Sequence, residues 1–374
     1  MSYPLIPLGQ LAKFINGDRG KNYPSKDSFV DIGIPFINAG CLSDLWVLDS
    51  SKFNYISEEA YDRLSSGKIQ KNDILFCLRG SVGKFAVIRD NNKGALASSL
   101  VILRGNDKVD IEYLKHYLAS SLCIKELDNY QNGAAQPNLS ANDFKKFLVP
   151  LPPLAEQRRI ASILDQADEL RQKRQQAIEK LDQLLQATFI DMFGDPISNS
   201  KKWTEKTLGE VVEFNTGKLD SNAAEENGIY PFFTCSRTPF AINTYAFDIE
   251  ALLLAGNNAA GQYWVKHYKG KFNAYQRTYV LTIKDSLCTY GYLRYVLQFL
   301  LGFLQRMSKG SSTKYLTLSI LKPIKIPIPP LELQRKFIQF YENIDSQNQL
   351  LIQNEIELNK LFCTLQNQAF NGTL

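Results

Sequence analysis

The sequence predicts two α/β (α+β) domains in tandem, each followed by a long α-helix, with the two helices paired as an antiparallel coiled coil. Three observations lead to this fold class: a proline-rich motif occurs twice, each copy precedes a long segment with a helical apolar pattern, and the segments before the two motifs resemble each other. A tandem repeat of this kind closes naturally as a pseudo-two-fold pair, which brings its helices together in opposite directions.

The repeated motif marks the start of each long helix. Its copies are Pro150-Leu-Pro-Pro-Leu-Ala-Glu-Gln-Arg-Arg-Ile160 and Pro327-Ile-Pro-Pro-Leu-Glu-Leu-Gln-Arg-Lys-Phe337. Proline is tolerated in the first turn of a helix and disfavours helix before it. Apolar residues then recur at alternating steps of three and four, which is the pattern of helices packed along a narrow seam. The two series include Ile160, Ile163, Ala167, Leu170, Ala177, Leu181 and Leu184, and Phe337, Tyr341, Ile344, Leu351, Leu358, Phe362 and Leu365.

Polar residues interrupt these stripes at Arg174, Asn348 and Glu355. An unpaired charge is costly inside a helix seam. If the two helices face each other about their centres, Arg174 falls beside Asn348. We expect Arg174 to form a hydrogen bond with Asn348 or Glu355, or to extend along the surface into solvent.

The motifs divide the chain into four parts. These are a globular domain at 1–152, a central helix at 153–198, a second globular domain at 199–329 and a C-terminal helix at 330–374. Each globular domain is expected to contain glycine-punctuated strands and an amphipathic helical segment, at 111–127 and at 290–307. The clearest repeated segments are Leu8–Gly17 with Leu208–Gly217, Tyr113–Leu118 with Tyr292–Leu297, and Gly133 with Gly310.

Composition limits the classes of function. The 374 residues carry a net charge of +5, and the second globular segment (199–330) holds 16 basic and 9 acidic side chains. A basic globular segment suits an anionic partner such as nucleic acid. The six cysteines are scattered and there are two histidines, so a metal site is not expected. No apolar run reaches membrane-spanning length, so we expect an intracellular protein without a membrane partner.

The sequence gives no positive sign of catalysis. Gly256-Asn-Asn-Ala-Ala-Gly261 has the glycine spacing of a phosphate-binding loop, but it lacks the Lys-Ser/Thr pair that must follow. Gly80-Ser-Val-Gly-Lys84 is too short for such a loop. Neither a methyltransferase motif nor a nuclease cluster stands out, so we predict a non-catalytic chain with no catalytic residues.

Polar and aromatic loops after the central strands are the candidate DNA-binding sites. Asn, Gln and Arg read base edges by paired hydrogen bonds, whereas Lys and Tyr suit phosphates. Glycine-rich loops are commonly polar in any case, which is the alternative for each single residue. The predicted DNA-binding residues are Arg79, Ser81, Lys84, Arg89, Asn92, Lys93 and Ser98 in the first domain, and Asn257, Asn258, Gln262, Tyr263, Lys266, His267, Lys269, Lys271, Tyr275, Gln276 and Arg277 in the second.

Together, the domain order, the Pro-Pro-Leu-x-x-Gln-Arg motif and the run Ala187-Thr-Phe-Ile-Asp-Met-Phe-Gly-Asp-Pro196 resemble the specificity subunit of type I restriction-modification systems. The resemblance covers essentially the whole chain. The second motif departs from the first in having Glu332-Leu333 where the first has Ala155-Glu156.

The resemblance implies that each globular domain reads one half of a bipartite, asymmetric double-stranded DNA site. It also implies that the helices act as a spacer and bind two methyltransferase (modification) subunits, which restriction subunits then join. S-adenosylmethionine, ATP and Mg would belong to those partners and no cofactor to this chain, which would act in the cytoplasm of a prokaryote.

The repeated polar residues at the helix starts are the predicted partner-binding positions: Glu156, Gln157, Arg158, Arg159, Gln334, Arg335 and Lys336. Solvation of a helix start is the simpler explanation for any one of them. Two other functions remain open at this point: the specificity region of a single-chain restriction-methyltransferase, separated from its enzyme, or a coiled-coil adaptor without a DNA role.

Overall fold

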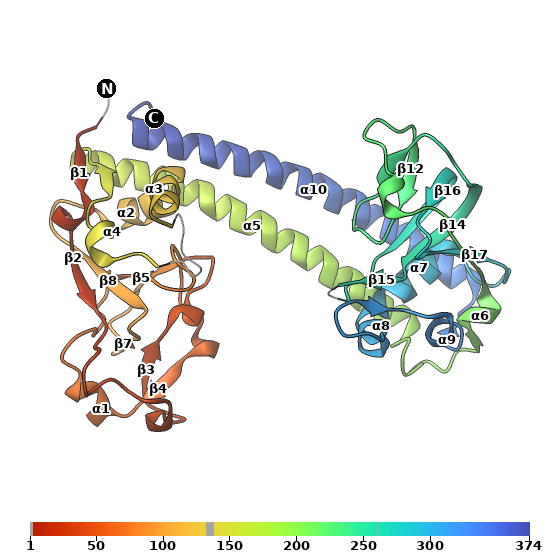
Figure 1. Cartoon of the computed structure of the whole chain (residues 1–374), viewed down its shortest axis with the longest axis horizontal. Helices are drawn as coiled ribbons and strands as arrows, with labels where there is room; N and C mark the ends of the chain where they lie inside the picture. The colour runs from red at the N-terminus through yellow and green to blue at the C-terminus, as the bar shows by residue number, and fades with distance from the viewer. Residues whose placement is uncertain (1–2, 132–137, 260) are drawn as a thin grey trace. The chain divides into compact units, whose positions relative to one another are not determined.

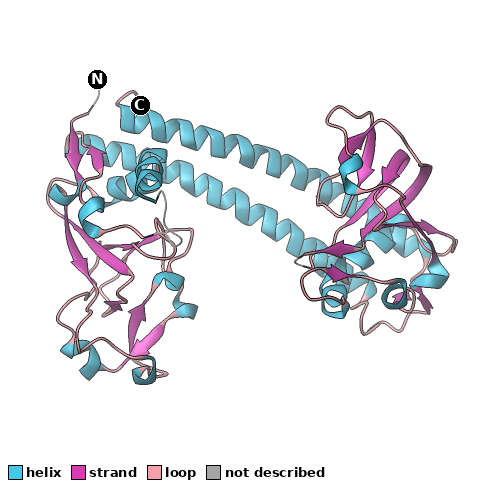
Figure 2. Cartoon of the chain, viewed as in Figure 1, coloured by secondary structure: helices cyan, strands magenta, loops and turns pink. Residues whose placement is uncertain are grey.

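The computed structural model describes residues 3–131, 138–259 and 261–374 (Figure 1). Gly133, one of the residues paired by the sequence repeat, lies outside them. The chain forms two compact units: unit 1 comprises Met1–Gln175 and Gln353–Leu374, and unit 2 comprises Gln176–Ile352. Both contain strands and helices (Figure 2). Among the described helices, none has the length and apolar character needed to cross a membrane.

Unit 1 is built on two small sheets. The larger has the strand order β2-β8-β5-β6 and is antiparallel throughout, and in the smaller, ordered β4-β3-β7, the β3–β7 pair is parallel. Strands β1 and β9 form a separate antiparallel pair. The strands are β1 (Leu5–Pro7), β2 (Ala12–Asn16), β3 (Ile34–Ile37), β4 (Asn54–Ile56), β5 (Ile74–Cys77), β6 (Phe85–Val87), β7 (Ala95–Leu96), β8 (Leu100–Gly105) and β9 (Leu148–Pro150), and the short helices are α1 (Glu58–Arg63), α2 (Ile111–Leu118), α3 (Ser121–Gln131) and α4 (Ala141–Phe144).

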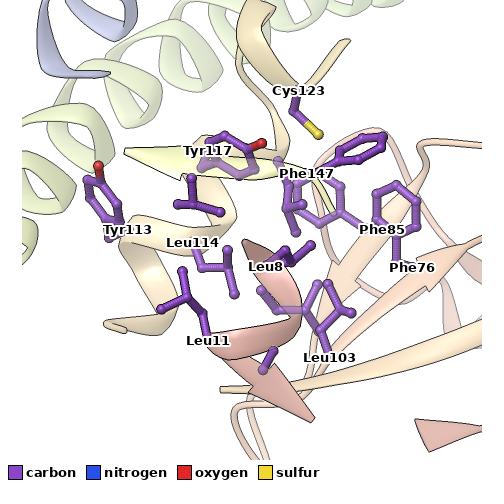
Figure 3. Packing of buried hydrophobic residues seen from close by; sticks show 14 of the residues in the cluster. Leu8, Leu11, Phe76, Phe85, Leu103, Tyr113, Leu114, Tyr117, Cys123 and Phe147 are labelled. Atoms are coloured by element: carbon purple, nitrogen blue, oxygen red, sulfur yellow. The ribbon is translucent and has the colours of Figure 1, made fainter. Parts of the chain in front are cut away.

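The main core of unit 1 lies between the larger sheet and α2 (Figure 3). Phe76 of β5, Leu103 of β8, and Tyr113 and Leu114 of α2 all belong to this core, and all four side chains are fully buried. The helix expected at 111–127 is divided in two, because α2 ends at Leu118 and α3 begins at Ser121. Burial of this apolar face is the main source of stability for such short elements.

Unit 2 has one six-stranded sheet with the order β11-β17-β14-β16-β12-β13, in which only the β12–β16 pair is parallel among the described strands. Two further pairs, β10–β19 and β15–β18, are antiparallel. The elements are β10 (Glu205–Thr207), α6 (Leu208–Val211), β11 (Val212–Thr216), β12 (Tyr230–Phe233), β13 (Phe240–Ile242), β14 (Phe247–Ala255), β15 (Asn257–Asn258), β16 (Val265–Ala274), β17 (Thr278–Ile283), α7 (Tyr290–Phe299), α8 (Leu301–Met307), β18 (Lys314–Tyr315), α9 (Leu318–Leu321) and β19 (Lys325–Pro327).

The two units repeat one topology, as the sequence repeat predicts. Strands β2, β8, β5 and β6 correspond to β11, β17, β14 and β16 in order and pairing. The parallel contact of β3 with β7 matches that of β12 with the last residues of β16, so one long strand of unit 2 is split into two in unit 1. The hydroxyl of Tyr113 donates to the carbonyl of Pro150, and Tyr292 donates to Pro327 in the same way. The internal repeat therefore extends to individual hydrogen bonds.

The long helices are α5 (Leu154–Phe193) and α10 (Leu331–Asn371), and each contributes one part to each unit. In unit 1, Arg159 near the start of α5 bonds the carbonyl of Leu374, and Arg171 bonds Asn359, 2.6 Å away. In unit 2, Asn348 donates to Asp182 over 3.1 Å, and Phe189 packs against Phe337. Within each unit the residue number rises along one helix as it falls along its neighbour, which confirms antiparallel pairing.

The predicted register of the helices is wrong. Asn348 bonds Asp182 instead of Arg174, which lies eight residues earlier in α5. Among the described residues, Arg174 is half-buried and forms no hydrogen bond with Asn348 or Glu355. With the helix centres opposite each other, Asn348 would face Arg174, whereas the contacts in the two units pair Asn348 with Asp182 and Arg171 with Asn359.

Candidate nucleic-acid interface

One end of the unit 2 sheet gathers three polar loops. Strand β14 runs antiparallel to both β16 and β17, with Leu254 opposite Val265 and Ala255 opposite Thr278. The end of β14 therefore lies beside the starts of the other two strands. The short pair β15–β18 extends from the same place, with Asn257 opposite Tyr315. We call this edge the loop end of unit 2.

Seven of the predicted residues reach the loop end. Among them, Tyr263 is buried and belongs to the core, so it is not exposed to a ligand. Gln276 approaches the carboxylate of Asp220 at 3.4 Å. Arg277 is exposed, and its guanidinium carbon lies 5.4 Å from the centre of the Tyr315 ring. The seven are Asn257, Asn258, Gln262, Tyr263, Tyr275, Gln276 and Arg277.

Lys266 forms hydrogen bonds within its own chain. Its ammonium donates to the carbonyls of Thr234 (3.4 Å) and Ser236 (2.6 Å), and the side chain is half-buried. Burial lowers the pKa of Lys266 below its ordinary value. An ammonium that is desolvated and bonded to two carbonyls of its own chain is poorly placed to neutralise a phosphate.

The remaining predicted residues of unit 2 lie farther along β16. Lys269 stands opposite Glu250 and its ammonium lies 3.3 Å from that carboxylate, which also contacts His267 at 3.0 Å. Lys271 stands opposite Asp248. The segment from Lys266 to Lys271 contains no acidic residue in the sequence, but the neighbouring strand supplies two. Sheet pairing thus reduces the basic character that the segment shows on its own.

Unit 1 divides its predicted residues in the same way. Arg79, Ser81, Lys84 and Ser98 lie where β5 ends and where β6 and β8 begin, which corresponds to the loop end of unit 2. Lys84 forms an ion pair with Asp44 at 2.8 Å, and Arg19 donates to the carbonyl of Ser98. We call this edge the loop end of unit 1.

Arg89, Asn92 and Lys93 follow β6 and lie at the opposite end of the sheet. Arg89 forms a two-bond ion pair with Glu112 of α2, and Lys93 pairs with Glu58. These three residues are not brought together with Arg79 and Ser98. The sequence places Arg89, Asn92 and Lys93 close to Arg79 because the strand between the two loops, β6, is short.

The sequence analysis missed Arg237, which lies in the turn between β12 and β13. Its guanidinium carbon is 5.4 Å from the centre of the Trp264 ring at the loop end of unit 2. A sequence signal was present, because Arg237 is the single basic residue between Lys218 and Lys266. The turn lies outside the loop after the central strand, where the predicted residues were placed.

The predicted partner-binding residues fall into two groups. Gln157 and Gln334 are fully buried. The side-chain oxygen of Gln157 accepts from the amide of Asp110, and its nitrogen donates to the carbonyls of Lys108 and Pro152. Gln334 makes the corresponding bonds to Thr289, Leu287 and Pro329. Neither amide is available to a partner in this structure; both fix the helix start to the adjoining domain.

The other helix-start residues are more accessible. Glu156 is half-buried, accepts from Tyr3 and pairs with Arg159. Arg158, Arg159, Arg335 and Lys336 are exposed, and Arg158 approaches Asp110 no closer than 3.7 Å. Their role in partner binding stays a prediction.

Among the described residues, no group of three or more His, Cys, Asp or Glu side chains is placed to hold a metal ion. The six cysteines are free thiols. Polar hydrogen-bonding side chains and exposed guanidinium groups make up the loop ends, and aromatic rings join them in unit 2. This set of groups can bind and discriminate a ligand by hydrogen bonding and stacking.

Two repeated α/β units, two long paired helices and a polar loop end on each sheet, with aromatic rings beside the arginines of unit 2, define a tandem nucleic-acid recognition protein. The chain belongs to the type I restriction modification DNA specificity domain family, whose model matches residues 5–180 and 200–360.

Relatives support the same assignment. Over 127 residues the chain is 42% identical to the EcoDI specificity subunit of Escherichia coli, a match that spans 34% of this chain and 28% of that relative. It is 24% identical to the MjaVIII specificity subunit of Methanocaldococcus jannaschii, over 100% of this chain and 93% of the relative. Among solved structures, the S subunit from M. genitalium has the same fold, with a TM-score of 0.64 at 19% identity over 99% of this chain and 96% of that one.

Proposed function

We propose that this chain is the non-catalytic DNA-recognition subunit of a type I restriction-modification complex, and that each unit reads one half of a bipartite, asymmetric double-stranded DNA site. The observation that carries the proposal is the contrast between the loop ends. One topology is used twice, yet the two loop ends present different side chains: Arg79, Ser81, Lys84 and Ser98 in unit 1, and Asn257, Gln276 and Arg277 in unit 2. A repeated scaffold with different exposed groups suits two different half-sites.

The helices and their starting turns would recruit two methyltransferase subunits, which restriction subunits would join. Arg158 and Arg335 occupy repeated, exposed positions of the two motifs and are the first candidates for this contact. S-adenosylmethionine, ATP and Mg would then serve chemistry on the partner subunits, in the cytoplasm of a prokaryote. Support for this part comes from the family and from the exposure of the repeated basic residues.

The test compares Lys269→Ala with Arg277→Ala, on the cognate DNA site and on a scrambled duplex, across a salt series. Arg277 is exposed beside an aromatic ring, and loss of a bidentate base contact should weaken cognate binding by about 1–3 kcal/mol while sparing the scrambled duplex. Lys269→Ala should weaken both DNAs alike and reduce the salt slope by roughly one unit.

Three outcomes count against the proposal or its parts. Equal weakening of both DNAs by Arg277→Ala would make Arg277 a phosphate or structural residue. Failure of the wild-type chain to prefer any DNA sequence would leave the coiled-coil adaptor as the better explanation. Methyl transfer by the isolated chain would contradict a non-catalytic role.

A further inference from the structure

The turn that carries Arg237 is fixed by hydrogen bonds from the half-buried side chain of Lys266. It joins β12 to β13, and the half-buried ammonium of Lys266 bonds the carbonyls of Thr234 and Ser236. Within the turn, the hydroxyls of Thr234 and Ser236 are 2.9 Å apart, and Ser236 also donates to the carbonyl of Thr238. A turn with this many internal bonds keeps one backbone conformation and presents its exposed side chain from a fixed base.

The same turn is attached to both neighbouring loops of the loop end. The sulfur of Cys235 lies 3.0 Å from the side-chain oxygen of Asn257 and 3.5 Å from the carbonyl oxygen of Arg277. The Arg237 guanidinium stacks near Trp264, the residue just before β16. The turn that carries Arg237 is therefore joined through Cys235 to the loops that carry Asn257 and Arg277, although Arg237 and Asn257 are 20 positions apart in the sequence.

Arg237 resembles Arg277 in lying against an aromatic ring, and it differs from four of the predicted basic residues. Lys84, Arg89, Lys93 and Lys269 each pair with a carboxylate. For Arg237, the contact found within the described residues is the Trp264 ring. Stacking on an aromatic face orients the guanidinium plane and leaves its five N–H donors free. A fixed, planar set of donors matches the two acceptors on the major-groove edge of guanine, and this is the commonest specific contact in protein–DNA recognition.

We propose that Arg237 reads a guanine in the half-site bound by unit 2, and that Lys266 is a positioning residue that holds the turn from which Arg237 extends. This inference rests on the proposed function. It adds a specificity-determining residue outside the loop after the central strand and gives Lys266 a role in place of phosphate binding.

The experiment is selection of bound duplexes from a library randomised over both half-sites. It uses the full chain expressed with its modification subunit, and sequencing gives the base preference at every position. Arg237→Ala should lose the preference for G·C at one position of one half-site, by roughly 5- to 150-fold, and keep the remaining positions. Lys266→Met retains most of the apolar stem but removes the ammonium, and it should weaken the preference at that same position. Lys269→Ala, on the same strand, is the matched control and should weaken all sequences alike without loss of preference at any position.

The possible results separate this inference from the function on which it rests. If the wild type selects no motif, the proposed function fails. If the wild type selects a motif and Arg237→Ala selects the same motif with the same preferences, this inference alone is wrong. Loss of preference at a position that is not G·C overturns the guanine assignment. If Lys266→Met lowers the salt slope by roughly one unit with every preference retained, Lys266 is a phosphate contact after all. Arg237→Gln, which preserves an exposed polar side chain, repeats the test should the alanine variant fold poorly.

Discussion

Replacement of Gln157 by methionine should destabilise unit 1 without changing unit 2. Gln157 is fully buried and satisfies three backbone groups: the amide of Asp110 at 2.8 Å and the carbonyls of Lys108 and Pro152 at 3.0 and 2.8 Å. Methionine has a similar volume but makes none of these bonds. At roughly 1 kcal/mol for each bond, the local free energy of unfolding should fall by about 3 kcal/mol.

Hydrogen exchange measured by mass spectrometry can follow this change in each unit separately. Since about 1.4 kcal/mol corresponds to a tenfold change, amides at the start of α2 and of α5 should exchange roughly 100-fold faster. Gln334→Met should have the corresponding effect at α7 and at the start of α10, because its side chain bonds the matching groups of unit 2.

Arg158→Met is the matched control for Gln157→Met. Arg158 is the next residue and its side chain is 70% exposed, so its replacement should change stability by no more than about 0.5 kcal/mol. The reasoning is refuted if Gln157→Met exchanges like the wild type, or if its exchange rises equally in both units. A variant intended to test partner binding should accordingly change Arg158 and leave Gln157 intact.

Three further predictions concern the helices and pH. Arg171→Ala should destabilise unit 1 by about 2 kcal/mol, because Arg171 bonds Asn359 on the other long helix and stacks on the Phe362 ring of α10. The loss should appear as a lower urea midpoint of unfolding, and an unchanged midpoint would contradict this prediction. Asn348→Leu should raise the Tm of unit 2, because it removes a buried side-chain oxygen that has no partner among the described residues, while the Asp182 carboxylate that loses the Asn348 hydrogen bond is exposed and can be solvated. A lower Tm would show that the bond to Asp182 outweighs the unpaired oxygen. Burial lowers the pKa of His116 in the folded chain. As pH falls below about 6.5, the unfolded chain therefore binds a proton at His116 more readily than the folded chain does, and unit 1 should lose stability. His116→Gln should flatten that pH dependence, and unit 2, with Tyr295 at the repeated position, should not show it.

The neutral state of His116 also follows from its hydrogen bonds. Its Nε2 lies 2.8 Å from Asp165 on α5, and its Nδ1 is buried without a partner among the described residues. A single proton on Nε2 satisfies Asp165, whereas a second proton would place an unsatisfied N–H in the core. Trp46 and Phe362 flank the ring, so no water-exposed face remains to stabilise a charge.

The sequence by itself determined the features that depend on local pattern. Proline spacing located the starts of α5 and α10, since proline disfavours helix in the residue before it, and heptad spacing predicted their pairing. The internal repeat predicted that both domains share one topology. The residue types of the loops indicated a nucleic-acid ligand. This could be read from sequence because the donors and acceptors that a side chain offers are set by its residue type, whatever the fold.

Tertiary structure alone decided which of these residues lie together. Strand pairing set Glu250 and Asp248 against the lysines of β16 and separated Arg89 from Arg79, and Cys235 joins the turn of Arg237 to Asn257 and Arg277. The motif glutamines are polar in sequence, yet folding buries them because unpaired backbone groups at the helix starts need their amides. Burial and cross-strand contact join residues far apart in the chain, and no local pattern carries that information.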